Sequence, residues 1–269
     1  MINLIFKYTF LQNAILGAIL ASIITGIIGS IIVEKKLVML SGGIAHISFG
    51  GLGLGYLINI EPIYSAFVFS IISSLGIVKL NASEKSYTDV IIGIFWSLGM
   101  ALGILFIYLT PGYPPDVNSY LFGDILTISK IDLILISITT VITVLVLVLF
   151  YNYWIAYFFD EDFFYVLGFN KKIFDYLLFV LITIAIISLL KLVGIILVIA
   201  LLTIPPSMAK LFSKSFNKII ILSTFFSLLF ILSGLYLSYI LNIPSGATII
   251  VTSALIYFIA LILKNAFKK

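Results

Sequence analysis

The sequence predicts an all-α fold, a polytopic bundle of transmembrane helices, from its composition and from the length of its apolar stretches. Hydrophobic residues make up 62% of the 269 residues, charged residues make up 10%, and the mean hydropathy is +1.29. A soluble core of this size cannot bury so much apolar surface. Nine stretches each approach or exceed the ~20 residues that a bilayer crossing requires. We therefore expect residues 1–269 to form a single transmembrane domain.

The expected helices follow one another with mostly short connections, which leave no room for a soluble catalytic domain. The first helix is too long for a signal peptide and lacks the cleavage-site pattern. Two stretches between 172 and 210 meet at Lys191, and counting them as one helix would reduce the total to eight. The nine stretches are 10–33, 37–58, 62–80, 88–110, 131–157, 172–190, 192–210, 217–241 and 244–264.

The lysines predict how these helices cross the membrane. All 15 basic residues are lysines, and they lie at or near expected helix ends. If nine helices alternate and the C-terminus is cytosolic, only Lys7, Lys130 and Lys191 lie outside. The positive-inside rule describes this kind of bias. We expect the N-terminus outside and the C-terminus inside, with membrane lipid around the apolar surface. The net charge of +4 then reflects topology and predicts no nucleic-acid partner.

The outer segment 110–130, TPGYPPDVNSYLFGDILTISK, is one of two longer connections. Its three prolines break helices, and Asp116 and Asp124 face the side from which a cation would arrive. A solvated surface loop with capping carboxylates explains the same residues. Both interpretations stay open from the sequence.

The second long connection, the inner segment 158–172, predicts a short amphipathic helix. Asp160 is a suitable N-cap, and Gly168 suits the C-terminal end. Spacing of i, i+3 and i+4 gives this helix one apolar face, formed by Phe163, Val166 and Leu167. Such a helix could dock in a groove on a partner protein, or it could lie against the membrane surface.

The chain's only histidine, His46, lies near the middle of the apolar stretch 37–58. An ionisable, metal-ligating group at bilayer depth is costly and is usually tied to transport. Small residues surround it, including Gly42 and Gly43, and they permit close helix packing. One interpretation is a narrow path in which the imidazole meets a passing divalent ion. The other is a packed interface in which His46 only bonds a neighbouring helix.

A rigid four-ligand metal site is hard to build here. The sequence has no cysteine, no second histidine, and no Asp or Glu in the middle of an expected helix. Transient contact between His46 and an ion fits these residues better. Catalysis within the membrane would need clustered titratable groups, so we expect no enzyme.

Six ordered blocks give the chain a specific family resemblance. Over roughly residues 30–262 it resembles the integral permease subunit of zinc and manganese ABC importers, the ABC-3 type, which implies a type II importer-like fold. The blocks are GGIAHISFGGLGLGY at 42–56, TDVIIGIFWSLGMALGILFI at 88–107, YLFGDILTISKIDL at 120–133, FDEDFFYVLG at 159–168, VGIILVIALLTIPPSMAKLFSKS at 193–215 and SGLYLSYILNIPSGATII at 233–250.

The resemblance implies a half-transporter in the plasma membrane of a prokaryote. Two copies of the subunit would form a homodimer around the path, two cytosolic ATP-binding subunits would drive it, and an extracytoplasmic binding protein would deliver zinc or manganese, with iron as a further candidate. The chain has no GxxxxGK[ST] motif, so the ATP would be bound by the partner and no cofactor is expected here. Residues 159–168 match the family's coupling helix, and His46 matches its histidine.

One departure from the family concerns the choice of metal. Many members have an Asp four residues before that histidine, whereas this chain has Gly42. A missing carboxylate removes a hard oxygen ligand and a negative charge. Gly42, Gly43, Asp116 and Asp124 remain candidates for lining the path. The alternative function is a secondary carrier or channel that is not coupled to ATP, but paired broken helices and intramembrane carboxylates are missing from the sequence.

Overall fold

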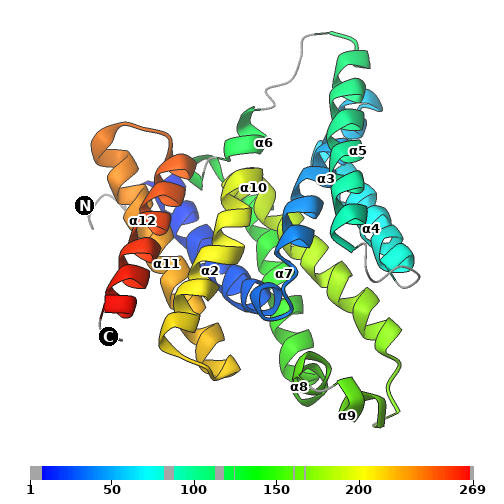
Figure 1. The fold of residues 1–269 in the computed structure, drawn as a ribbon. Helices are drawn as coiled ribbons and strands as arrows, with labels where there is room; N and C mark the ends of the chain where they lie inside the picture. The colour runs from blue at the N-terminus through cyan, green and yellow to red at the C-terminus, as the bar shows by residue number, and fades with distance from the viewer. Residues whose placement is uncertain are drawn as a thin grey trace. The chain divides into compact units, whose positions relative to one another are not determined.

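The structure is a computed structural model that describes residues 8–81, 88–112, 118–123, 125–159, 161–166 and 168–266. Within these ranges the regular elements are all helices, as predicted (Figure 1). In chain order they are α2 (Thr9–Glu34), α3 (Val38–Leu57), α4 (Pro62–Asn81), α5 (Thr88–Leu109), α6 (Asn118–Phe122), the 3₁₀ helix η2 (Ile125–Thr127), α7 (Lys130–Leu149), α8 (Tyr151–Phe159), α9 (Glu161–Val166), α10 (Lys171–Phe212), α11 (Phe216–Leu241) and α12 (Ser245–Ala266).

Eight helices of the described residues are long and apolar enough to cross a bilayer: α2, α3, α4, α5, α7, α10, α11 and α12. The 42-residue α10 is about twice the length that one crossing needs. Its backbone leaves helical geometry at Gly194, with φ 76° and ψ 165°, a region that glycine enters without steric cost. The two expected stretches 172–190 and 192–210 are therefore both present, joined in one element, and their boundary lies at Gly194 instead of Lys191.

The expected helix 131–157 is wrong as a single element. α7 ends at Leu149, and α8 begins at Tyr151. At 1.5 Å per residue, the 20 residues of α7 already match the ~30 Å of a hydrocarbon core. The remaining residues are rich in Tyr and include a Trp, and both residue types favour the membrane interface. Apolarity alone does not separate such a segment from the span before it.

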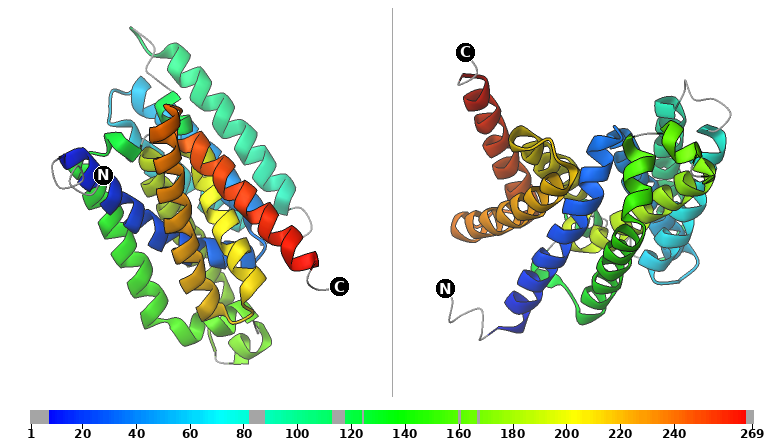
Figure 2. Two further views of the ribbon diagram at one scale, coloured as in Figure 1. Left: turned by 90° about the vertical axis from the view of Figure 1, so that its left-hand side faces the viewer. Right: turned by 90° about the horizontal axis from the view of Figure 1, so that it is seen from below.

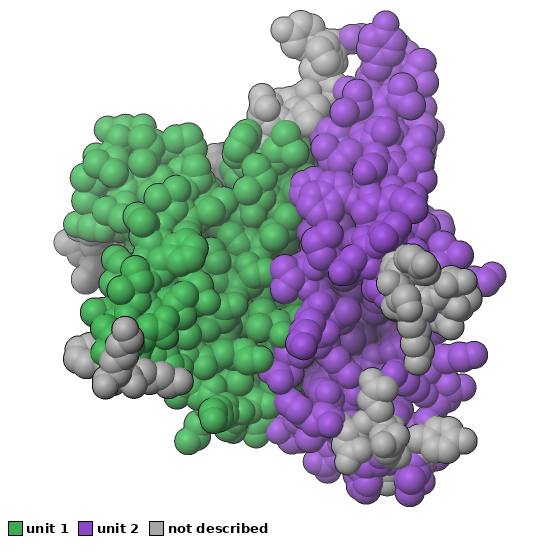
Figure 3. Space-filling model, in the orientation of Figure 1, with its two compact units in different colours: residues 1–33, 117–140, 188–269 green, residues 34–116, 141–187 purple. Residues whose placement is uncertain are grey.

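The chain divides into two compact units (Figure 3). Unit 1 contains residues 1–33, 117–140 and 188–269, and unit 2 contains residues 34–116 and 141–187. Helices α7 and α10 each contribute residues to both units. We describe the packing of each unit separately.

Unit 1 contains a pair of helices, α11 and α12, that lie side by side (Figure 2). They approach closely where a Cβ built on Gly234 would lie 2.6 Å from Cα of Ile249. A second contact joins α2 to α11 through the hydroxyl groups of Thr25 and Ser227, 2.7 Å apart. Small residues and hydroxyl pairs are the usual means of joining helices in lipid.

Two lysine contacts agree with the predicted membrane sides of helix ends. In unit 2, Lys35 Nζ donates to the carbonyl oxygen of Tyr157 at 2.7 Å, and both residues belong to predicted inner ends. In unit 1, Lys191 Nζ lies 3.0 Å from Oδ1 of Asp132, and both belong to predicted outer ends. These contacts support the pairing of helix ends, while the absolute orientation stays a prediction.

Candidate functional site

Helix α3 is held against α5 by backbone contact in unit 2. Gly50 and Gly53 of α3 meet the backbone of Gly99 and Gly103 of α5. A Cβ built on Gly99 would lie 2.6 Å from Cα of Ile47, so a side chain larger than hydrogen would push the helices apart. The other side of α3 packs in the same way on α4, where a Cβ on Gly51 would lie 2.5 Å from Cα of Ala66. This explains why α3 needs so many glycines.

His46 lies on the α5-facing stripe of α3, between the contacts made by Gly43 and Gly50. Its imidazole stacks on the indole of Trp96 in α5, with ring centroids 4.2 Å apart and an interplanar angle of 21°. Both side chains are half-buried. The structure therefore places the predicted histidine in a helix–helix seam with an aromatic partner.

The hydrogen bonding of His46 identifies the ring nitrogen that is available for a ligand. Nδ1 lies 2.9 Å from the carbonyl oxygen of Gly42, and a carbonyl oxygen only accepts, so Nδ1 carries the proton of the neutral ring. The lone pair is then on Nε2, which has no hydrogen-bond partner among the described residues. Metal-ligating histidines are commonly oriented in this way, with one N–H donated to a backbone carbonyl.

No group of three or more His, Asp or Glu side chains that could hold a metal ion occurs in the described part of the chain. The predicted path candidates Gly42 and Gly43 are both buried beside His46, and Gly42 contributes its carbonyl oxygen to the imidazole. The arrangement offers a passing ion one nitrogen ligand from this unit.

The second predicted site is α9, which presents an apolar face. Phe163 and Val166 are 53% and 79% exposed, whereas Phe164 between them is 1% exposed. Phe164 packs against aromatic rings of α8 and α10, with centroids 5.6 Å from Tyr157 and 4.8 Å from Phe174. Phe164 thus anchors the helix inward, while Phe163 and Val166 stay exposed.

A hollow of about 340 Å³ adjoins this face and is lined by Phe163 together with Val148, Leu149, Tyr151, Asn152 and Tyr153. Gly168 has a φ of 76° shortly after α9 ends at Val166, which fits its predicted C-terminal position. Asp160 and Leu167, also predicted here, lie outside the described residues, as do the outer carboxylates Asp116 and Asp124.

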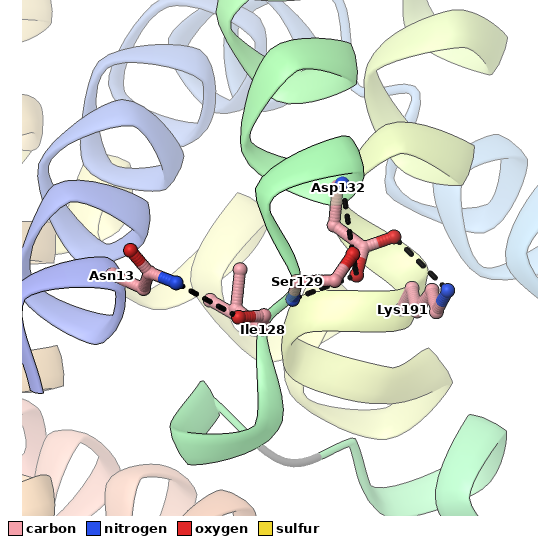
Figure 4. Close-up of polar contacts among 5 residues, drawn as sticks. All are labelled: Asn13, Ile128, Ser129, Asp132 and Lys191. Carbon is pink, nitrogen blue, oxygen red and sulfur yellow. Dashed lines mark hydrogen bonds and ion pairs between the residues drawn. The ribbon is translucent and has the colours of Figure 1, made fainter. Parts of the chain in front are cut away.

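A polar cluster lies at the start of α7 in unit 1 (Figure 4). Ser129 donates to the Asp132 carboxylate from both its backbone N–H, at 3.0 Å, and its hydroxyl, at 2.6 Å. The Lys191 ammonium forms an ion pair with the other carboxylate oxygen of Asp132. Asn13 Nδ2 donates to the carbonyl oxygen of Ile128 at 3.2 Å. These contacts cap α7 and join it to α10 and α2, so we assign the cluster a structural role.

A model of the ABC 3 transport family matches residues 7–264 of the chain. The chain belongs to the ABC 3 transport family. This confirms the resemblance and identifies a multi-pass plasma-membrane protein, the permease kind of ABC transporter subunit.

Among its relatives is a membrane protein of Synechocystis sp., 38% identical over 255 residues, which cover 95% of this chain and 91% of that protein. Another is the manganese transport system membrane protein MntC of Listeria monocytogenes, 33% identical over 254 residues, 94% of this chain and 90% of that protein.

The fold of this ABC 3 chain also matches a solved structure. PsaBC from Streptococcus pneumoniae, in complex with Fab, aligns with a TM-score of 0.85 at 28% identity, covering 96% of this chain and 93% of that chain. The likeness extends over nearly all of both chains. The helical bundle is therefore an ABC permease fold.

Sequence reasoning missed Trp96, the aromatic partner of His46. A signal was present, because Trp96 is one of only two tryptophans and lies at helical spacing from Gly99 and Gly103. Local spacing does not show, however, which helix packs against α3. The contact of Lys35 with Tyr157 was missed for the same reason.

Proposed function

We propose that the chain is the membrane-spanning subunit of an ATP-driven importer that moves a divalent transition metal ion, manganese foremost, into the cell. The observation that carries this proposal is likeness over 94% of the chain to relatives named as manganese transport system membrane proteins. Separate ATP-binding subunits and an extracytoplasmic binding protein complete the transporter, and a second copy of this chain provides the other half of the path.

The environment of His46 supports transit of an ion. A neutral imidazole nitrogen is a ligand for several first-row divalent metals, and carboxylates add affinity for harder ions such as Mn²⁺. A path must also release its ion, so one imidazole from each of two copies suits passage better than a closed four-ligand site, which binds its metal tightly. Zinc and iron share this nitrogen chemistry, and the preference for manganese rests on the names of the relatives.

The apolar face of α9 supports coupling to a partner. Phe163 and Val166 are large, exposed and outside the predicted spans, and the adjoining hollow provides a surface into which a partner side chain fits. In this proposal the face docks on the ATP-binding subunit, and Leu167, which lies outside the described residues, is expected to take part. ATP hydrolysis takes place in that partner and not in this chain.

Transport by the reconstituted complex tests the proposal. The chain is co-expressed with its ATP-binding subunit, reconstituted in proteoliposomes and supplied with the metal-loaded binding protein, and uptake of radiolabelled Mn²⁺ is followed. We expect uptake that needs ATP hydrolysis on the cytosolic side and that a catalytically dead ATPase abolishes. Uptake driven by a proton or sodium gradient without ATP would instead identify the secondary carrier, and passive uptake would identify a channel.

A further inference from the structure

We propose that Trp96 is a positioning residue for metal transit, because its indole holds the His46 imidazole in the orientation in which Nε2 meets the ion. The inference rests on the proposed function and adds to it a residue of α5, outside the helix that carries His46. It is carried by the geometry of the α3–α5 seam.

Trp96 faces α3 because of its position on α5. The residues Ile92, Gly99 and Gly103, at spacings of four, three and seven from Trp96, all contact α3. Trp96 lies between the first two of these contacts and therefore on the same helix face. The indole is directed into the seam at the level of His46.

Two contacts together define the orientation of the imidazole. The bond from Nδ1 to the Gly42 carbonyl, at 2.9 Å, fixes one edge of the ring and its tautomer. The stacked indole, at a centroid distance of 4.2 Å and an interplanar angle of 21°, fixes the plane of the ring, and contacts between aromatic rings are favourable. A His side chain has two torsions, so an edge contact and a face contact suffice to hold it, with Nε2 left unpaired among the described residues.

The glycines make the stacking possible. Gly99 touches the backbone of Ile47, the residue next to His46, so the two helices are in backbone contact beside the ring pair. A wider separation would leave room for the imidazole to rotate. Removing the indole has the same consequence, since it opens space beside a side chain that keeps only one bond to its own helix.

The two tryptophans of the chain allow a direct measurement. In a Trp154→Phe background, Trp96 is the only tryptophan, and its emission reports on the ring that stacks on His46. The full chain is placed in lipid nanodiscs and titrated with Mn²⁺, a paramagnetic quencher, with Mg²⁺ as the matched control ion. We expect saturable quenching by Mn²⁺ that His46→Gln removes. Absence of quenching in the parent background, or equal quenching in His46→Gln, would overturn the inference.

Transport kinetics then separate positioning from packing. Loss of a group that orients a metal ligand typically weakens metal affinity ~10–100-fold, so Trp96→Leu should raise KM for Mn²⁺ by about this factor with a smaller change in kcat. Trp96→Phe keeps a ring face and should recover most of the affinity. Leu98→Ala, at a side chain of α5 that is 52% exposed, is the control for helix damage and should leave KM unchanged.

The outcomes for Trp96 and for the proposed function are distinct. If the parent complex shows no ATP-dependent Mn²⁺ uptake, the proposed function fails, while the quenching titration still decides whether the ion meets the ring pair. If Trp96→Leu transports with the parent KM, the indole is packing alone. Should Trp96→Leu fail to yield folded protein, the quenching titration and the KM of Trp96→Phe decide, and a loss in Trp96→Phe as large as in His46→Ala would contradict stacking as its role.

Discussion

Helix α3 buries 14 of its 20 residues, whereas α9 leaves Phe163 and Val166 largely exposed and hides Phe164. A function is predicted for both elements, but one buries most of its side chains and the other exposes its large apolar ones. In α3, glycines make the contacts with α4 and α5, and the imidazole of His46 is held from two sides. In α9 the ring of Phe164 anchors the helix, and Phe163 and Val166 stay largely exposed.

The difference indicates two ways of using apolar sequence in one membrane protein. Close packing of small residues creates a seam in which two contacts define the orientation of His46, as the proposed ion path requires. Exposed large side chains outside the predicted spans are the kind of surface that the proposed docking on a partner would cover. The following predictions test whether the two regions behave so differently.

The largest expected effect is all-or-none and concerns the side of the membrane on which α9 lies. Single cysteines at Ser119 and Asn170, in a chain without native cysteine, should react with an impermeant thiol reagent from opposite sides, with Asn170 labelled only from the cytosolic side. Inside-out and right-side-out vesicles provide the two conditions. Labelling of both positions from one side would contradict the predicted topology and the docking of α9.

The next effect is on assembly with the ATP-binding subunit. Replacing Phe163 and Val166 with Ser should weaken co-purification of that subunit by ~2–4 kcal/mol, the usual size for two anchor residues, without lowering the thermal stability of the chain. Phe164→Ser is the matched control: because this ring is 1% exposed, it should lower thermal stability first. Unchanged assembly in the double variant would mean that α9 only covers the membrane surface.

A smaller effect is expected from adding one methyl group to the α3–α5 seam. Gly99→Ala places a Cβ 2.6 Å from the Ile47 backbone, and overpacking of this kind costs ~1–3 kcal/mol. Gly93→Ala, on the same helix, has nothing within 4 Å of its Cβ and should be neutral or stabilising by up to ~1 kcal/mol. Thermal unfolding followed by circular dichroism measures both. Equal stability of the two variants would contradict close packing at Gly99.

The smallest effect is expected at the outer ion pair. Lys191 is 40% exposed, and exposed pairs contribute ~0–1 kcal/mol, so Lys191→Met should change thermal stability little. Asp132→Ala should cost more, ~1–2 kcal/mol, because Ser129 also loses its helix-capping partner. A larger loss in Lys191→Met than in Asp132→Ala would reverse this assignment.

Much of the fold could be predicted because long apolar stretches leave few alternatives to membrane-spanning helices. The errors occurred where hydropathy does not vary. The stretch 131–157 stays apolar through Phe150, although α7 has already reached its full length at Leu149. The boundary in α10 was predicted at the charged residue Lys191. This side chain pairs with Asp132, and the helix continues to Gly194, where φ is positive and the backbone leaves helical geometry.

Less of the candidate site could be predicted. The position of His46 and its small neighbours were evident, because one imidazole in an apolar stretch is conspicuous. Its partner Trp96 and the unpaired state of Nε2 depend on which helix packs on α3 and at what distance, and both are tertiary properties. Spacing predicted one apolar face for Phe163, Val166 and Leu167, of which the described Phe163 and Val166 are exposed. The inward anchoring of Phe164 could be seen only in the aromatic contacts with α8 and α10.

The most direct test of the central claim is Mn²⁺ uptake by a complex that carries His46→Ala. At equal protein level, with ATPase assembly and thermal stability close to those of the parent, we expect ATP-dependent uptake to fall by more than ~10-fold, since even the groups that orient a metal ligand contribute this much. Uptake equal to that of the parent would contradict the account, and it would show that His46 serves packing alone and that the metal path lies elsewhere.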